Sequence, residues 1–253
     1  MKVTFLGTGT SQGVPVIACE CAVCNSTDAR DKRLRVSVML EQDGKVIVID
    51  AGPDFRYQML RAGVKHLDAI ILTHEHKDHI AGLDDIRAFN YKQQSAIDIF
   101  AHTRVQDALK REFSYIFANF KYPGIPMLNL KDIDQLPFQV SGIEVLPIEV
   151  LHYKLPVLGF RIGDFTYITD AKTVSGKERE KIKGSKILVV NALQRESHIS
   201  HFNLAEALIF ADEMKAEKTY FTHISHRMGM HEDIAQDLPS NIEFAYDGLV
   251  MEL

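Results

Sequence analysis

The sequence feature that most constrains this chain is the stretch of residues 73–79, THEHKDH, which directly follows the apolar run of residues 69–72. Four side chains of metal-binding types fall within six positions of it: His74, His76, Asp78 and His79. A strand that ends in such a cluster places its ligands at the rim of a sheet, where a ligand pocket usually opens. Asp78 and His79 are adjacent and point in different directions, so one metal ion cannot easily use all four side chains. The stretch therefore predicts two metal ions side by side.

Further side chains of the same types follow other strand-like runs. His152, Asp170 and His223 each stand directly after an apolar run, as His74 does. A single histidine or aspartate at a strand end is more often a turn residue, but four such strand ends form a constellation. We therefore expect these side chains to complete two metal shells. Asp50 also ends a strand, where it is either a turn former or the carboxylate that orients a metal-bound imidazole.

The three cysteines of the chain, Cys19, Cys21 and Cys24, lie within six positions of one another. An odd number so closely spaced does not indicate a disulfide framework. Thiolates this close favour one shared zinc ion, which prefers four ligands in a tetrahedron. Three thiols leave one vacancy, so we expect a structural zinc completed by a distant histidine. Three free, reduced thiols in a loop are the alternative.

A glycine-rich loop, GTGTSQG at residues 7–13, follows a first strand over residues 3–6. Such a loop can cradle a phosphate, but no P-loop lysine follows it and the dinucleotide-binding spacing is absent. A plain tight connection is an equally good reading.

Length and charge limit the class of protein. The 253 residues fit a single domain, 1–253, and the net charge of −5 gives no support to a broad surface for nucleic acid or anionic membranes. No apolar run approaches the roughly 18 residues of a membrane span. The first residues reach a glycine too soon for a signal peptide, so we expect a cytoplasmic protein.

The order of elements predicts an α/β fold. Each half of the chain runs from a strand hairpin into strand and helix alternation, which predicts two similar α/β layers that pair their sheets. We expect one amphipathic helix after His79, a helix over residues 55–61 capped by Asp54, and a last hairpin around Asp247 and Gly248. Residues 113–126 are aromatic and broken by prolines, so they predict a lid, a homodimer contact or ordinary packing.

Residues 73–79 match the HxHxDH motif of the metallo-β-lactamase superfamily, and the later strand-end residues fit its downstream ligands in order. The resemblance spans nearly the whole chain and implies a metallo-β-lactamase αββα four-layer sandwich with the metals at one sheet edge. It implies a first metal on His74, His76 and His152, a second on Asp78, His79 and His223, and Asp170 as the bridge between them.

Residues 7–15 and 19–24 resemble the start of the PhnP-like cyclic-phosphate phosphodiesterases, and residues 223–226 resemble their C-terminal motif. This resemblance implies that His226 completes the structural zinc site. It also implies zinc or manganese in the catalytic pair, and a histidine outside the metal shell near the scissile phosphate. His201 matches that histidine, and the nearby His198 is the competing assignment.

The implied activity is hydrolysis of a small, cyclic phosphodiester by a hydroxide that bridges the two metals. Asp78 acts at the reacting centre as a ligand, and His201 donates a proton to the leaving group. A ribonuclease Z-like endonuclease shares the metal core, but the acidic balance and the lack of a basic arm disfavour nucleic acid. Hydrolysis of a thioester, lactam or lactone remains an alternative. A non-catalytic, PqqB-like role is disfavoured by the complete ligand set.

Overall fold

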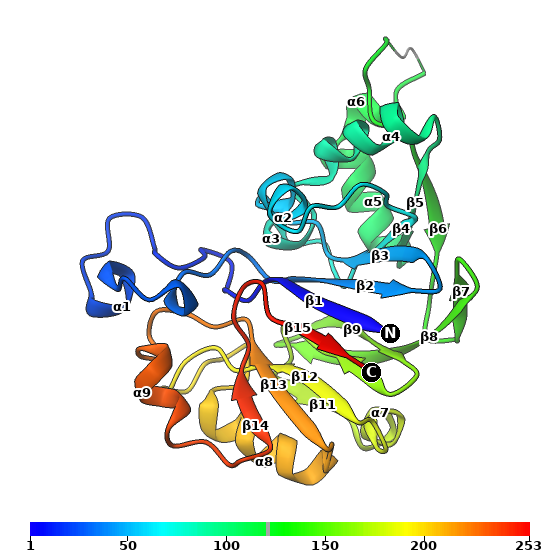
Figure 1. The fold of residues 1–253 in the computed structure, drawn as a ribbon. Coiled ribbons are helices and arrows are strands. Elements are labelled where there is room, and N and C mark those ends of the chain that lie inside the picture. The colour runs from blue at the N-terminus through cyan, green and yellow to red at the C-terminus, as the bar shows by residue number, and fades with distance from the viewer. Residues whose placement is uncertain (120–121) are drawn as a thin grey trace.

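The computed structural model describes residues 1–119 and 122–253 (Figure 1). The strands of its first sheet are β1 (Lys2–Gly7), β2 (Ser37–Gln42), β3 (Lys45–Ile49), β4 (Ala69–Ile71), β5 (Ile97–Ala101), β6 (Leu128–Asp132) and β15 (Val250–Glu252). Those of the second are β7 (Phe138–Val140), β8 (Ile143–His152), β9 (Leu155–Ile162), β10 (Phe165–Tyr167), β11 (Thr173–Val174), β12 (Ile187–Asn191), β13 (Lys218–Thr222) and β14 (Ile242–Phe244).

The helices are divided between the two halves of the chain. The first half of the chain carries α2 (Phe55–Arg61), α3 (Lys77–Ile80), α4 (Arg87–Gln93), α5 (Thr103–Glu112) and α6 (Ser114–Phe117). The second half carries α7 (Gly176–Ile182), α8 (Leu204–Met214) and α9 (His231–Ala235), and α1 (Ala22–Asn25) lies in the cysteine loop. Short 3-10 turns span Ala29–Asp31 and Leu83–Ile86. None of the helices in the described residues is long and apolar enough to cross a membrane.

The two sheets pack face to face, and helices cover their outer faces (Figure 1). The strand order is β15-β1-β2-β3-β4-β5-β6 in one sheet and β11-β8-β9-β10-β12-β13-β14 in the other, with β7 paired to β8. Ile47 and Ile49 of β3 belong to the core between the sheets, whereas Val48 packs with Phe55 of α2 on the outside. This is the alternation of a strand that is buried on both faces. The αββα sandwich is therefore confirmed.

Strand direction brings the predicted ligands to one edge of the sandwich. β3, β4, β5 and β6 pair in parallel, as do β10, β12, β13 and β14. β8 runs in the direction of β10, because each pairs antiparallel with β9 between them. The carboxyl ends of strands that run together meet at one edge of a sheet, which is where a ligand site forms.

The expected hairpin around Asp247 and Gly248 is wrong. β14 pairs in parallel with β13 of the second sheet, whereas β15 pairs antiparallel with β1 of the first. The turn is real, since Gly248 has φ 92°, but the chain crosses from one sheet to the other there. Local turn chemistry predicts a reversal and does not specify the partners of the flanking strands.

The single helix expected after His79 is interrupted. α3 ends at Ile80, a 3-10 turn follows at Leu83–Ile86, and α4 begins at Arg87. At Gly82 a Cβ atom would lie 2.1 Å from the carbonyl oxygen of Gly52, so the backbone passes too close for a side chain. Glycine inside a helical pattern here marks a close approach of two segments.

Asp54 precedes α2 as expected, but its side chain makes no cap hydrogen bond. Its carboxylate accepts instead from the backbone N–H of Arg35 at 2.8 Å. By contrast, Asn203 and Glu206 form a complete capping box at the start of α8.

The structure bears on two further expectations, one for the glycine-rich loop of residues 7–13 and one for residues 113–126. The glycine-rich loop after β1 commits the N–H groups of Gly9, Thr10 and Gly13 to backbone carbonyls, as in a tight connection. Within residues 113–126, the hydroxyl of Tyr115 in α6 hydrogen-bonds to Asp84. Residues 120–121 of that segment lie outside the described residues, and its role as a lid or dimer contact stays a prediction.

Candidate active site

The ends of four strands deliver the predicted ligands to one place. His74 follows β4, His152 ends β8, Asp170 follows β10 and His223 follows β13. The Nε2 atom of His223 lies 3.3 Å from Oδ1 of Asp170, and Nε2 of His79 lies 3.3 Å from Oδ2 of the same carboxylate. Asp170 therefore sits between two histidines, one on α3 and one directly after β13.

The side chains of α3 complete this half of the cluster. The carboxylate of Asp78 lies 3.2 Å from Nε2 of His79 and 3.7 Å from Nε2 of His223. His79 and His223 are buried, and their rings stack with centroids 6.2 Å apart. Asp78, His79 and His223, the predicted second set, are thus brought together with Asp170 beside them.

The predicted first set forms the other half. Nε2 of His74 lies 3.0 Å from Nδ1 of His76, and the ring of His152 has its centroid 5.2 Å from that of His76. Nδ1 of His152 lies 2.9 Å from the carbonyl oxygen of Ser200, which fixes the ring against the loop before α8.

Several residues of the cluster have a left-handed backbone. Asp50, Asp170 and His223 have φ values of 64°, 58° and 57°. Non-glycine residues rarely adopt this conformation, and where they do, it is commonly at a functional site. The sharp turn at each strand end directs the side chain to the edge of the sandwich.

Asp50 and Thr73 lie within hydrogen-bonding distance of the imidazoles of the cluster. Oδ2 of Asp50 lies 2.7 Å from Nδ1 of His79, and both side chains are fully buried. Thr73 donates its N–H to Asp50 at 2.9 Å, and its hydroxyl lies 3.0 Å from Nδ1 of His74. The geometry matches the orienting role considered for Asp50. Thr73 was not singled out by the sequence, although its place directly before His74 is the signal that could have found it.

Opposite charges dominate the electrostatics of the cluster. Burial lowers the pKa of His79, but the carboxylates of Asp78 and Asp50 outweigh it and raise that pKa well above the ordinary value. Burial raises the pKa of Asp170, yet the charges of His223 and His79 hold it well below its usual range. The buried carboxylates therefore favour a positive charge beside them, and a proton on His79 or a metal cation supplies it.

The donor atoms fit metal ions. Nε2 of His79, both ring nitrogens of His223 and Nδ1 of His201 are among the buried atoms of the described residues that make no hydrogen bond, although carboxylate oxygens lie 3.2–3.3 Å from Nε2 of His79 and of His223. Buried polar atoms normally have partners, so unpaired ones need an explanation such as a bound ion. His74, His79 and Asp170 form one group of mutually close ligand atoms, and Asp78, His79 and His223 form another. Imidazole and carboxylate ligands suit zinc and manganese alike.

Of the two competing histidines, His201 lies against the rings of the ligand cluster. It is buried, and its ring lies between those of His152 and His223, with centroid distances of 4.5 and 4.7 Å. The ring centroid of His198 lies 5.2 Å from that of His201. Nδ1 of His201 also forms a close group with ligand atoms of His152 and Asp170. Burial and the charge of His223 lower the pKa of His201 to about 2.

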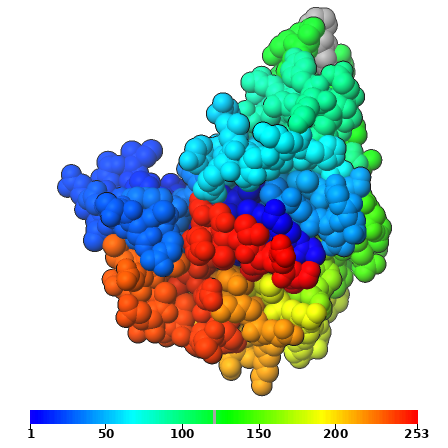
Figure 2. Space-filling view, in the orientation of Figure 1, coloured from blue at the N-terminus to red at the C-terminus, as the bar shows by residue number. Residues whose placement is uncertain are grey.

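The cysteine loop forms a second, separate cluster. Nδ1 of His226 lies 3.2 Å from Sγ of Cys19, 3.4 Å from Sγ of Cys21 and 3.6 Å from Sγ of Cys24. A hydrogen bond from the N–H of Cys24 lowers the pKa of Cys21 to about 6, whereas burial raises the pKa of Cys24 to about 11. Three sulfurs and one imidazole match the preferred donor set of zinc. Figure 2 shows this N-terminal segment as a blue lobe against the orange C-terminal segment.

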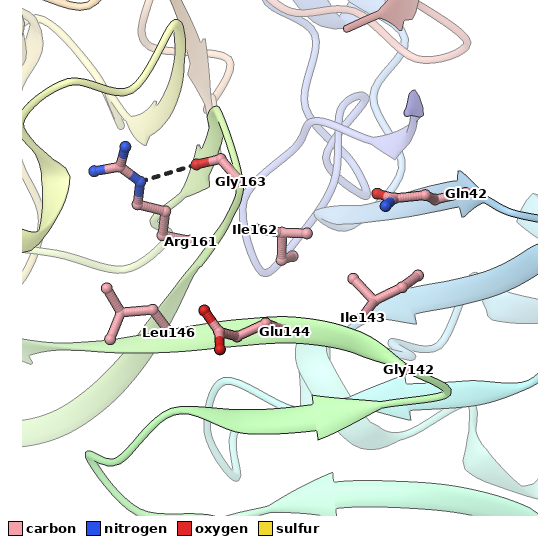
Figure 3. Close-up of a pocket in the computed structure, with 8 residues that line it drawn as sticks. All are labelled: Gln42, Gly142, Ile143, Glu144, Leu146, Arg161, Ile162 and Gly163. Atoms are coloured by element: carbon pink, nitrogen blue, oxygen red, sulfur yellow. Dashed lines mark hydrogen bonds between the residues drawn. The ribbon is translucent and has the colours of Figure 1, made fainter.

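Another cavity, of about 370 Å³, lies away from these clusters (Figure 3). It is lined by the turn at Gly142, the turn at Gly163 and the amino-terminal part of β8, whose other end is His152. Arg161 lines it, and its guanidinium donates to the carbonyls of Gly163, Lys181 and Lys183. The cavity contains none of the predicted site residues.

Comparisons with known proteins agree with this geometry. The family described as Beta-lactamase superfamily domain matches residues 45–224. A crystal structure of a diphosphatase from the PhnP family superposes with a TM-score of 0.93 at 39% identity, covering 99% of this chain and 96% of that one. Zinc-bound PqqB from Methylobacterium extorquens shares the fold, with a TM-score of 0.82 at 17% identity over 100% of both chains.

A curated relative from Porphyromonas gingivalis, named octanoyltransferase, is 39% identical over 98% of this chain. The chain spans about half of that relative, 51% of its length. The family match and the relatives' identity agree with the motif at residues 73–79, and the chain belongs to the β-lactamase superfamily, with the metallo-β-lactamase fold.

Proposed function

We propose that the chain is a metal-dependent phosphodiesterase that hydrolyses small phosphodiesters, with cyclic phosphates and diphosphates in its range. The observation that carries this proposal is the cluster of buried ligand atoms around Asp170, which faces ligand groups from both sheets. The similarity to a PhnP-family diphosphatase over almost the full length of both chains supports a phosphate ester as the substrate. We also infer that residues 1–253 act as one domain.

The proposal assigns the predicted ligands to two metal ions. His74, His76 and His152 would hold one divalent ion, Asp78, His79 and His223 would hold a second, and the carboxylate of Asp170 would serve both sets. Two such ions supply activation of water and neutralise the negative charge of the ester. Asp50 and Thr73 hold the imidazoles of His79 and His74 in orientation. Cys19, Cys21, Cys24 and His226 hold a structural zinc.

His201 is the proposed proton donor to the leaving oxygen. Its pKa of about 2 makes the ring neutral before substrate binds. An anionic phosphate beside the ring favours its protonated form and raises that pKa toward the working range. The proton then reaches the leaving oxygen as the ester bond breaks.

The variant His201→Ala tests this role. We expect unchanged metal content and a loss of turnover of about 10²–10⁴-fold for an alkyl leaving group. The loss should be much smaller for p-nitrophenolate, which leaves without a proton. His198→Ala is the matched control and should retain most activity. Loss of metal from His201→Ala would identify His201 as a ligand and remove it from the role of acid.

Substrate class is tested by one parallel assay. Protein loaded with zinc or manganese is given a chromogenic phosphodiester, a 2′,3′-cyclic nucleotide, a diphosphate diester, a phosphomonoester, a thioester and a β-lactam. We expect turnover of the diesters and its loss in Asp170→Ala together with bound metal. Turnover of only the thioester and the lactam would contradict the proposal.

A second candidate is hydrolysis of an acyl thioester. The relative named octanoyltransferase motivates it, although this chain matches only 51% of that protein. The same ligand cluster can serve both reactions, since each requires activated water and a stabilised oxyanion. An octanoyl thioester in the parallel assay decides between them. A tRNA substrate remains disfavoured by the net charge of −5.

A further inference from the structure

A cavity of about 550 Å³ opens directly beside the proposed catalytic metals. Two of its lining residues are His76 and His152, and the rest come from the turn between β8 and β9 and from the loop before His201: Tyr153, Lys154, Leu155, Ile199 and Ser200. Its size is that of a pocket for a small organic ligand. A phosphate held at the metals would therefore have its remaining substituent directed into this cavity.

Tyr153 is unusual in the wall of this cavity. Its φ is 57°, a left-handed conformation that disfavours a large side chain, and the residue is 51% exposed. Glycine or asparagine would fit such a turn with less strain. A strained position that carries a half-exposed ring gains little from packing, which points to a role in binding.

Lys154 supplies a positive charge beside that ring. Its Nζ lies 5.3 Å from the centroid of Tyr153, and no carboxylate of the described residues pairs with it. Ile199 also lines the cavity, and this apolar residue is 65% exposed. The cavity thus combines an aromatic face, an apolar face and an uncompensated cation.

We propose that this cavity binds the non-reacting part of the substrate, and that this part is a planar aromatic heterocycle with a second anionic group. The heterocycle stacks on Tyr153 and contacts Ile199, and the anion pairs with Lys154. Aromatic rings bind bases in this way with little dependence on sequence. The substrate class is a nucleoside phosphodiester that carries a further phosphate. This inference rests on the proposed phosphodiesterase function.

Substrates with one shared leaving group isolate the contribution of the cavity. Methyl p-nitrophenyl phosphate, thymidine 5′-p-nitrophenyl phosphate and its 3′-phosphorylated form all release p-nitrophenolate. For the wild type, we expect kcat/KM to rise in that order. Tyr153→Gly keeps the backbone conformation and removes the ring, so it should lower kcat/KM by about 5–50-fold for both thymidine substrates through KM. The methyl ester should change less than about 2-fold, and Tyr153→Phe should retain the wild-type values.

Lys154→Met tests the second anion, with the exposed Lys177→Met as the matched control. We expect Lys154→Met to abolish the advantage of the 3′-phosphorylated substrate and to leave the unphosphorylated one unchanged. An equal loss on all substrates in Tyr153→Gly, or no loss on any, would overturn the subsite while the phosphodiesterase function stands.

Binding provides a readout that does not depend on turnover. Calorimetry with metal-loaded protein and thymidine 3′,5′-bisphosphate should give a Kd about 5–50-fold weaker for Tyr153→Gly than for Tyr153→Phe. Equal Kd values would overturn the subsite. If no diester is hydrolysed but this difference in Kd is found, the proposed function fails and the subsite stands as a nucleotide-binding site.

Discussion

At the scale of single residues, the site depends on side chains that do not touch the substrate. Asp50 is fully buried, and burial raises its pKa although the charge of the neighbouring His79 opposes this. A buried carboxylate needs a compensating partner, and here that partner is the ring of His79 at 2.7 Å. The pair therefore fixes both the orientation of the ring and the nitrogen that faces the metal site.

Asp50→Asn should weaken metal binding by about 10–100-fold without unfolding the protein. The amide keeps the size of the carboxylate but removes the charge that orients the imidazole. Competitive titration with a chromogenic chelator measures the affinity, and the thermal midpoint checks the fold. Asp43→Asn, at an exposed turn, is the matched control. Equal affinity in both variants would show that Asp50 is dispensable for orientation.

At the scale of elements, close backbone contacts position α3. A Cβ atom at Gly52 would lie 2.0 Å from the carbonyl oxygen of Asp78, so the loop after β3 passes directly against α3. The N–H of Ala51 donates to the carbonyl of His79 at 2.8 Å, which ties the same two segments together. The position of both ligands on α3 thus depends on a glycine twenty-six residues earlier in the chain.

Gly52→Ala should displace α3 and reduce metal occupancy of the site holding Asp78 and His79. A backbone oxygen cannot rotate away as a side chain can, so we expect a destabilisation of about 1–3 kcal/mol. Gly176→Ala, where a Cβ atom has open space, is the control. Metal analysis and denaturant unfolding measure the two effects. Full occupancy with unchanged stability in Gly52→Ala would show that α3 adapts without cost.

At the scale of the whole molecule, the segment between β14 and β15 joins the two sheets. Asp247 accepts hydrogen bonds from the hydroxyl of Thr8 at 2.8 Å, from the N–H of Leu34 at 2.9 Å and from Arg61 at 3.2 Å. Burial raises the pKa of Asp247, although these hydrogen bonds oppose the shift. One carboxylate therefore links the crossover, the loop after β1, the approach to β2 and α2.

Asp247→Ala should lower the free energy of unfolding by about 2–3 kcal/mol, because it leaves the hydroxyl of Thr8 and the N–H of Leu34 without this acceptor. Urea denaturation measures the loss, and Asp237→Ala in the exposed loop after α9 serves as the control. Metal content should remain at the wild-type level in the folded protein. A change within about 0.5 kcal/mol would contradict the role of Asp247 as a link between the sheets.

Much of the site could be predicted from local sequence. The ligand types, their places after strand-like runs and the cysteine spacing all indicated metal chemistry before any contact was known. Asn203 and Glu206 form a capping box at the start of α8, and such a box is satisfied within one turn of chain. These features depend on neighbours in sequence, so the sequence alone specifies them.

Only the tertiary structure decided how distant segments meet. It separated β14 from β15 into different sheets, broke the helix after His79 at Gly82, and buried His201 between His152 and His223. It also placed Tyr153 and Lys154 beside the ligands. Strand pairing and close backbone contacts depend on residues far apart in the chain, which no local pattern records. The sequence by itself determined which side chains this protein offers to metals, and the packing of two sheets decided which of them share a site.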